Sequence, residues 1–506
     1  MAVAIANRFG GINTIPIYTM KIIKDDSGQI IAEDLVKGTG TSAPDFKLAG
    51  GAIIKIDWSD LSCGDPLTCP EWTKTALIGD AIFTKLGTDL SGDWARVPIH
   101  LIGHSRGTSV NSRLAADLGA NGIWVDHFTT LDPHPVTIFG DFDVKVWKNV
   151  LFADNNYQEI LFPTGLHYKN GTYQRDLTKI LSDVGIKCDR SGYLDSTEKG
   201  GPHEQVHTYY HGTILGDDAC ADQVLVQYEW YEPKYPTRKT GYYFSRIGKG
   251  DRYSLDDTEI EPLIHPKDGL HYRLIASNKD NRADLDLSNN YSAWPNATFK
   301  PFENENAYNV QVGSKVDFTY YYQDADSKLD ITFALDNDTN PFNNSNNNYY
   351  KEIGSQTGKT KRGTISAKTK FSWIPTDADI GTHYVQIKAT DANGHVRYDY
   401  LLNKSLTISQ TDIKASPKTL TLKTKESDDV TVTVTGSEGR PVVSETVTAT
   451  ILKSGTKHIS VSPQSSDTDT NGQSIFTITA TNKTGDAKVR FEAAGVETTV
   501  KVRVVK

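Results

Sequence analysis

Val97-Pro98-Ile99-His100-Leu101-Ile102-Gly103-His104-Ser105-Arg106-Gly107 is the stretch that decides how the N-terminal part of this chain folds. Its apolar first half, residues 97–102, predicts a short buried strand. After Gly107, apolar residues recur at helical spacing, at Val110, Leu114, Ala115 and Leu118. A Gly-x-Ser-x-Gly sequence between a strand and a helix predicts a sharp turn that excludes side chains from both flanking positions. We expect this turn to lift the Ser105 hydroxyl clear of the sheet and to direct the positive end of the helix towards it.

Strand and helix patterns alternate around this turn. Residues 53–57 predict a strand, and the apolar positions between Trp72 and Leu86 predict a helix with one apolar face. Further strands are expected over residues 125–131 and 144–152. Alternation of this kind is typical of a mostly parallel sheet flanked by helices, which is the fold class expected for residues 1–250.

Beyond residue 306 the pattern becomes rich in strands. Residues 315–322, 370–373 and 383–390 predict strands that are separated by turn residues, without a long helical pattern between them. Residues 306–410 are therefore expected to form an all-β sandwich of immunoglobulin-like or cadherin-like type.

Residues 411–506 continue in the same manner. Apolar residues alternate with polar ones, as at Val430, Val432 and Val434. The segment resembles the bacterial Ig-like domains of invasin-type and other surface proteins, which implies a second β-sandwich. Between the two parts, residues 251–305 predict a linker or a small β-rich insert.

The composition excludes some partners. The 506 residues include 54 Lys and Arg against 63 Asp and Glu, which gives a net charge of −9. An acidic balance argues against binding to nucleic acid or to an anionic membrane surface. No apolar run reaches transmembrane length, and the first twenty residues lack the pattern of a secretory signal.

The four cysteines leave two interpretations open. They are Cys63, Cys69, Cys188 and Cys220, and their spacings match no zinc motif. An even number suits two disulfides, Cys63–Cys69 and Cys188–Cys220; alternatively, all four are reduced thiols. Two methionines and many Thr, Asn, Asp and Tyr residues favour an extracellular or cell-surface location.

Activation of the Ser105 hydroxyl requires a base to take its proton and a carboxylate to orient that base. Two acids stand at the ends of expected strands, Asp132 after residues 125–131 and Asp154 after residues 144–152. Three histidines follow later in the chain: His203, His207 and His211. The order Ser, acid, His is that of the α/β-hydrolases.

Four short motifs, in order along residues 50–215, resemble those of the pancreatic-type lipases in the α/β-hydrolase superfamily. They are Ile56-Asp57-Trp58-Ser59, Gly103-His104-Ser105-Arg106-Gly107, Thr130-Leu131-Asp132-Pro133 and the segment around His203. The resemblance implies an α/β-hydrolase fold in which Ser105 is the nucleophile, Asp132 the orienting acid and His203 the base. It also implies hydrolysis of carboxylic esters through an acyl-enzyme, without a metal or an organic cofactor. Asp154 remains the alternative acid, and His207 and His211 remain the alternative bases.

The oxyanion donors are less completely matched. The backbone N–H of Arg106 is the expected first donor. Lipases usually carry a His-Gly pair after an earlier strand, and the loop there gives the second donor. This chain has no such pair before Asp57. The expected substitute is Phe9 or Gly10, because both follow the apolar residues 2–6, which predict a strand.

Two acidic segments of the β-rich part supply oxygen ligands of the kind that calcium prefers. They are Gln323-Asp324-Ala325-Asp326-Ser327 and Asp336-Asn337-Asp338-Thr339-Asn340. Neither fits an EF-hand loop, so these segments are either structural calcium sites or solvated turns.

Three functions remain open from the sequence. The first is a serine ester hydrolase whose β-sandwich tail contacts a cell surface or a polymer. The second is a surface adhesion or binding protein with an inactive hydrolase-like domain. The third keeps the Ser-His-Asp triad but acts on peptides or thioesters, or transfers the acyl group.

Overall fold

The computed structural model describes most of the chain, in two compact units. The described residues are 1–11, 13–38, 43, 45–62, 72–90, 92–160, 165, 172–183, 202–215, 240–245, 247, 282–288, 291–299, 309–324, 326–344, 350–358, 369–436, 439–452 and 455–506. One unit comprises Met1–Pro301, Thr319–Thr369 and Tyr384–Lys404. The other comprises Phe302–Phe318, Lys370–His383 and Ser405–Lys506.

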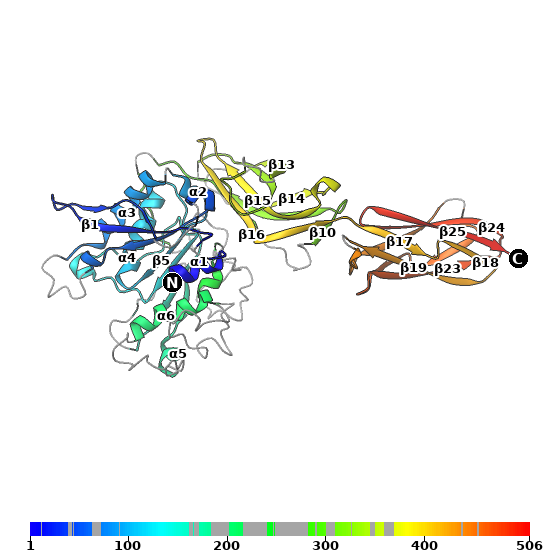
Figure 1. Cartoon of the computed structure of the whole chain (residues 1–506), viewed down its shortest axis with the longest axis horizontal. Helices are drawn as coiled ribbons and strands as arrows, with labels where there is room; N and C mark the ends of the chain where they lie inside the picture. Colours follow the sequence, from blue (N-terminus) through cyan, green and yellow to red (C-terminus); the bar gives the residue numbers. More distant parts are fainter. Residues whose placement is uncertain are drawn as a thin grey trace. The chain divides into compact units, whose positions relative to one another are not determined.

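The strands of the N-terminal part form two small sheets (Figure 1). In the first, β1 (Ile17–Lys24) pairs with two antiparallel strands, β2 (Ile30–Ala32) and β3 (Val36–Lys37), and with one parallel strand, β4 (Ile53–Asp57). In the second, all neighbours are parallel and the order is β5 (His100–His104), β6 (His127–Leu131), β7 (Ala153–Tyr157) and β8 (Tyr173–Asp176).

Helices cover the second sheet on both faces. Of these helices, α4 (Arg106–Ala120) contacts β5 and β6, and α6 (Pro202–Leu215) contacts β6 and β7. The other helices of this part are α1 (Ala2–Arg8), α2 (Phe46–Ala49), α3 (Thr75–Asp89) and α5 (Thr178–Asp183). Apolar residues of α3 and α4 share a buried cluster with Phe128 of β6. The neighbouring cluster joins α1 and α6 to Leu131 of the same strand. In Figure 1, α3 and α4 accordingly lie on one side of β5, and α1 and α6 on the other. Of the helices that the structure describes, none is both long enough and apolar enough to cross a lipid bilayer.

Two predictions in this part are wrong. Residues 2–6 form a helix and not a strand, since an alanine-rich apolar run without alternation favours a helix and Ala4 and Ala6 are buried on its inner face. Residues 144–152 contain no strand, and they take part only in isolated bridges between Val125 and Val150 and between Trp147 and Ala283. The strand begins only at Ala153, where its register with Phe128 starts.

The middle of the chain is built of strands, which confirms the three predicted there. They are β9 (Asn296–Phe299), β10 (Asn309–Gln311), β11 (Val316–Gln323), β12 (Asp330–Asp336), β13 (Tyr350–Thr357), β14 (Thr369–Trp373), β15 (Gly381–Thr390) and β16 (Val396–Ser409). They form sheets in the orders β10-β16-β15-β12-β13 and β14-β11-β9. Because β9 pairs with β11, strand pairing begins before residue 306.

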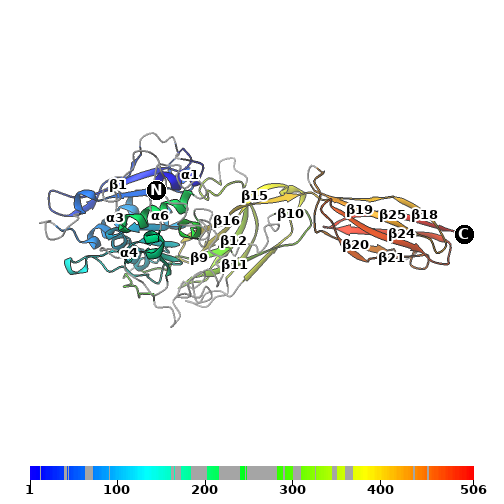
Figure 2. The same ribbon diagram turned by 90° about the horizontal axis from the view of Figure 1, so that it is seen from below.

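The C-terminal strands also form two sheets, as expected for a β-sandwich (Figure 2). The strands are β17 (Asp412–Ser416), β18 (Thr419–Lys423), β19 (Ser427–Thr435), β20 (Thr446–Ile451), β21 (Ile459–Ser462), β22 (Ser465–Asp467), β23 (Gln473–Ala480), β24 (Gly485–Ala493) and β25 (Val496–Val505). Their orders are β17-β19-β23-β21 and β18-β25-β24-β20-β22. Every second residue of β19 from Val430 is buried, and the rings of Phe476 and Phe491 pack 5.0 Å apart in the same core. The alternation predicted in this segment is thus confirmed.

Candidate active site

Ser105 occupies the sharp turn between β5 and α4. Its dihedral angles are φ 52° and ψ −126°, a conformation that costs free energy for any residue other than glycine. Hydrogen bonds fix it on both sides: Ser105 N donates to the carbonyl of Leu131 (3.0 Å), and Thr108 Oγ1 donates to the Ser105 carbonyl (2.6 Å). The Ser105 hydroxyl makes no hydrogen bond to any residue that the structure describes. The predicted turn is formed, and it presents this hydroxyl.

The two glycines of the motif differ in why they are needed. A Cβ at Gly103 would lie 2.7 Å from the carbonyl oxygen of Gly107, so no larger residue fits there. A Cβ at Gly107 would meet nothing within 4 Å. The expectation that the turn excludes a side chain from both positions is therefore wrong for Gly107, which lines an open cavity in the first turn of α4.

Asp132 and His203 are brought together from β6 and α6. Asp132 directly follows β6, is fully buried and has φ 43°. Its Oδ2 accepts a hydrogen bond from His203 Nδ1 at 2.6 Å. Gln158 donates twice to the same carboxylate, from its backbone N (2.9 Å) and from Nε2 (2.9 Å). Nδ1 of His203 is thus held, whereas its Nε2 has no hydrogen-bond partner among the described residues.

Sequence reasoning missed two residues that shape the surroundings of Asp132. Gln158 follows β7 by one position, and it lies outside every motif recognised in the sequence. Gly165 packs so closely that an added Cβ would clash with Asp132 Oδ1. Neither residue carries a local signal, since their proximity to Asp132 arises only when β6 and β7 pair.

His104, the last residue of β5, contacts His203. Its Nε2 donates to the backbone carbonyl of His203 at 3.0 Å, and the two rings lie 4.5 Å apart. Burial, and then the proximity of the His203 ring, lower the pKa of His104. A neutral His104 with its proton on Nε2 fits this contact, because that tautomer is the donor which the His203 carbonyl requires.

The two alternative bases lie further along α6. His207 is one helical turn beyond His203, and its ring lies 5.8 Å from that of His104. Burial lowers the pKa of His207 to about 4, so that it is neutral at physiological pH. His211 is buried two turns beyond His203. Of the three predicted histidines, His203 is the one that the structure joins to Asp132.

The alternative acid belongs to a different cluster. The sequence predicted that Asp154 follows a strand, but Asp154 lies inside β7. Its Oδ1 accepts hydrogen bonds from His127 Nε2 (2.7 Å) and Thr129 Oγ1 (2.5 Å), and its Oδ2 accepts one from Asn156 Nδ2 (3.1 Å). Burial raises the pKa of Asp154 to about 6. The structure therefore joins Asp154 to His127 of the neighbouring strand.

Arg106 contributes differently through its backbone and its side chain. It is the first residue of α4, where a backbone N–H has no acceptor within the helix. Its guanidinium binds the buried Asp141 carboxylate through two hydrogen bonds of 2.7 Å and donates to the Thr73 carbonyl at 2.9 Å. It also stacks 3.6 Å from the centroid of the Trp72 ring. The Arg106 side chain is therefore bound to Asp141, Thr73 and Trp72, whereas its backbone N–H lies next to Ser105 in the chain.

Phe9 and Gly10 do not fit the role of second oxyanion donor in this structure. Their backbone N–H groups donate to the carbonyls of Ala6 (2.9 Å) and Asn7 (3.3 Å), where α1 ends. Gly10 has φ +93°, which suits the end of a helix. The Gly-Gly pair terminates a helix and does not follow a strand, so both N–H groups are already bonded.

The acidic segments of the β-rich part form turns. Asp324 Oδ1 accepts the backbone N–H of Asp326 (2.8 Å), and Asp336 Oδ1 accepts that of Asp338 (3.2 Å). Burial raises the pKa of both Asp324 and Asp336 to about 6. In the described part of the chain, no group of three or more His, Cys, Asp or Glu side chains is arranged to hold a metal.

The cysteines of the two predicted disulfides lie outside the described residues; they are Cys63, Cys69, Cys188 and Cys220.

No protein-family model and no curated protein matches the sequence. The chain shows a likeness to WR4, a C. elegans MSP family member, at 17% identity and TM-score 0.15, over 18% of this chain and 97% of that one. It shows another to domains 4 and 5 of the S-layer protein SbsC, at 18% identity and TM-score 0.17, over 27% of this chain and 62% of that one. A third is to the Yersinia pseudotuberculosis adhesin InvE, at 13% identity and TM-score 0.19, over 42% of this chain and 59% of that one. These likenesses assign neither a family nor a function.

Proposed function

We propose that the chain is a serine carboxylic ester hydrolase of the α/β-hydrolase type. Two features carry the proposal. Ser105 is strained and follows β5 directly. The buried Asp132, which follows β6, accepts a hydrogen bond from His203 Nδ1 at 2.6 Å. The order of these three groups along the chain is that of the α/β-hydrolases, and Ser105 and Asp132 follow the carboxyl ends of the parallel strands β5 and β6.

The chemistry follows from the proposed roles of these side chains. Nε2 of His203 takes the proton of Ser105 Oγ as Oγ attacks the ester carbonyl carbon. Asp132 keeps the proton of His203 on Nδ1 and stabilises the imidazolium that forms. The N–H of Arg106 and the N-terminus of α4 stabilise the oxyanion. His203 then protonates the leaving alcohol, and a water activated by the same nitrogen releases the acid from the acyl-enzyme.

Hydrolysis of p-nitrophenyl esters of increasing chain length by the wild type and by Ser105→Ala tests this proposal. We expect the substitution to lower kcat by at least ~10³-fold, since removal of the nucleophile disables the whole triad. Ser27→Ala is the matched control, because that hydroxyl is exposed in the β1–β2 turn and bonds only Asp25. Turnover by Ser105→Ala at the wild-type rate would refute the proposal.

A second candidate, a surface adhesion or binding protein with an inactive hydrolase-like unit, is favoured by one observation. The N–H groups of Phe9 and Gly10 are both bonded within α1 and its end, which leaves the oxyanion with Arg106 alone among the predicted donors. Loss of one such donor raises the barrier by roughly 3 kcal/mol. Absence of turnover in both the wild type and Ser105→Ala would favour this candidate.

The wider setting is part of the same proposal. We place the protein outside the cell or at its surface, with the β-rich tail contacting a cell surface or a polymer and no nucleic-acid partner, in keeping with the net charge of −9. A comparison of matched ester, thioester and amide substrates distinguishes ester hydrolysis from the alternative acyl chemistry.

A further inference from the structure

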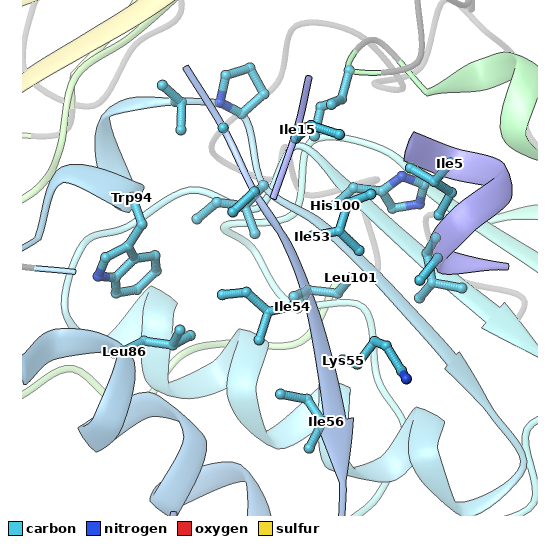
Figure 3. Close-up of a pocket in the computed structure, with 18 of the residues that line it drawn as sticks. Ile5, Ile15, Ile53, Ile54, Lys55, Ile56, Leu86, Trp94, His100 and Leu101 are labelled. Atoms are coloured by element: carbon cyan, nitrogen blue, oxygen red, sulfur yellow. The ribbon is translucent and has the colours of Figure 1, made fainter. Parts of the chain in front are cut away.

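The parallel strands of the N-terminal part are interrupted between β4 and β5. Within the described residues, β4 pairs with β1 and β5 pairs with β6, and no ladder joins β4 to β5. A cavity of about 780 Å³, here called the slot, is bordered by both strands (Figure 3). Residues 53–56 of β4 and all of residues 100–104 of β5 line it. Since consecutive residues line the slot, it meets the edges of the strands and not one face of them.

The backbone of β4 offers hydrogen-bonding groups to the slot. In a parallel ladder, the N–H and C=O of one residue point to one neighbouring strand, and those of the next residue point to the opposite side. Ile53 N donates to the carbonyl of Pro16 (2.9 Å), so Ile53 and Lys55 face β1. The alternate residues Ile54 and Ile56 therefore direct their backbone groups into the slot.

The backbone of β5 offers hydrogen-bonding groups to the opposite side of the slot. Ser105 N donates to the carbonyl of Leu131 (3.0 Å), and the carbonyl of Ile99 accepts hydrogen bonds from the strand region of β6. Odd-numbered residues of β5 thus face β6, and Ile102 directs its N–H and C=O into the slot. Among the described residues, β5 pairs with β6 alone, and the Ile102 backbone groups make no hydrogen bond outside the strand ladders.

Helices line the slot on two sides, as they line a strand inside a layered sheet. Ile82, Val110 and Leu114 of α3 and α4 line one side, and Ile5 of α1 and His207 of α6 line the other. Every residue of β6 and β7 is buried, whereas β4 has no fully buried residue and β5 has one. Helices therefore cover β4 and β5, yet the edges of both strands remain accessible from the slot.

We propose that the slot binds an extended, apolar segment of a partner polypeptide, about five residues long, as a parallel strand between β4 and β5. A peptide supplies both the N–H and C=O groups that the facing edges require, and its alternate side chains meet the helices on the two sides. An acyl chain would fill the volume but would leave the backbone groups of Ile54, Ile56 and Ile102 without partners, which is unfavourable in a buried site. The bound strand would leave the slot beside Ser105, at the end of β5. The proposal does not rest on Ser105 being a nucleophile.

Single-residue hydrogen exchange on the full chain tests this inference. In the free chain, we expect the amides of Ile54, Ile56 and Ile102 to exchange at least ~10-fold faster than those of Lys55 and Leu101, whose ladder hydrogen bonds are made. The probe is the peptide acetyl-Lys-Thr-Val-Ile-Val-Thr-Lys-amide, which should slow the three slot amides at least ~10-fold at saturation and leave the other two unchanged.

Two controls make the result specific. The same peptide with proline in place of its isoleucine cannot complete the ladder and should protect none of the slot amides. Val110→Phe, which projects extra volume into the slot from α4, should abolish the effect of the probe, whereas Leu77→Phe at an exposed position of α3 should not. Ser105→Ala should respond as the wild type does, which separates this inference from the proposed function.

Three outcomes would overturn the inference. One is equally slow exchange of all five amides in the free chain, which would mean that the slot is already bonded. Another is the absence of protection by the probe while the chain remains folded. The last is equal protection by octanoate or by raising the concentration of the chain alone, which would assign the slot to an acyl chain or to a second copy.

Discussion

Replacing Asp132 by asparagine should inactivate the proposed hydrolase while keeping the volume of the side chain. The carboxylate accepts three hydrogen bonds, two from Gln158 at 2.9 Å and one from His203 Nδ1 at 2.6 Å. If the asparagine oxygen keeps the bond from the Gln158 backbone, its NH₂ group faces His203 Nδ1. His203 must then accept at Nδ1 and carry its proton on Nε2. That nitrogen can no longer take the proton of Ser105.

The size of the effect follows from the tautomer. In the Ser-His-Asp triad of serine proteases, the same substitution lowers kcat by about 10⁴-fold, which corresponds to about 5 kcal/mol of activation free energy. Asp154→Asn is the matched control, because Asp154 is equally buried but bonds His127. We expect that substitution to change kcat by less than ~10-fold, since it touches no group of the proposed triad.

The assay is the kcat for p-nitrophenyl butyrate, normalised to folded protein by circular dichroism. The kcat should fall by about four orders of magnitude in Asp132→Asn and by less than one order in Asp154→Asn. A kcat for Asp132→Asn within tenfold of the wild type, or an equal loss in Asp154→Asn, would refute the assignment of Asp132 as the orienting acid.

Three further predictions concern stability, each measured by urea unfolding followed by tryptophan fluorescence. Gly103→Ala should lower the free energy of unfolding by about 1–3 kcal/mol, because the new methyl group meets the Gly107 carbonyl, and Gly107→Ala should lower it little or raise it; equal effects would contradict this. Burial raises the pKa of Asp154 from 3.8 to about 6, so its protonated form stabilises the fold fully below pH 4, and that stabilisation is lost as the pH rises through 6. The wild type should therefore lose about 2 kcal/mol relative to Asp154→Asn between pH 4 and pH 7, and a constant difference would count against it. Asp141→Asn should cost roughly 3–5 kcal/mol by leaving the Arg106 guanidinium buried without its counter-charge, and a loss below about 1 kcal/mol would contradict this.

The local structure around Ser105 could be predicted because its signals are local. The apolar residues 97–102 precede the turn, and helical spacing starts directly after it, so β5 and α4 follow from the pattern alone. Asp132 was found for a similar reason, since it directly follows an expected strand within the motif Thr130-Leu131-Asp132-Pro133. The alternating strands of the C-terminal sandwich were also predictable, because one face of each sheet is buried.

What could not be predicted depends on tertiary packing. β7 consists of Ala153-Asp154-Asn155-Asn156-Tyr157, all buried, and polar residues of this kind do not form an apolar pattern. They are stable inside the sheet because side chains of β6 satisfy them, as Thr130 does for Asn155 at 2.8 Å. The apolar residues 144–152 therefore attracted the strand prediction instead.

The proximity of the site residues was equally invisible. His203, His207 and His211 occur on one helix, and their residue pattern does not distinguish them. The resemblance to lipases implied His203, and the packing of α6 against β6 joins that residue to Asp132. The same holds for Gln158, which reaches Asp132 because β7 lies beside β6. The slot between β4 and β5 likewise arises from strand pairing, which the order of strands along the chain does not specify.

The most direct test of the central proposal is to treat the full chain with a fluorophosphonate probe and to map the adduct by mass spectrometry. We predict one adduct per chain, located on Ser105 and absent from Ser105→Ala, with labelling slowed strongly in Asp132→Asn. An unlabelled chain that is folded, or an adduct on another residue, would contradict the assignment of Ser105 as an activated nucleophile.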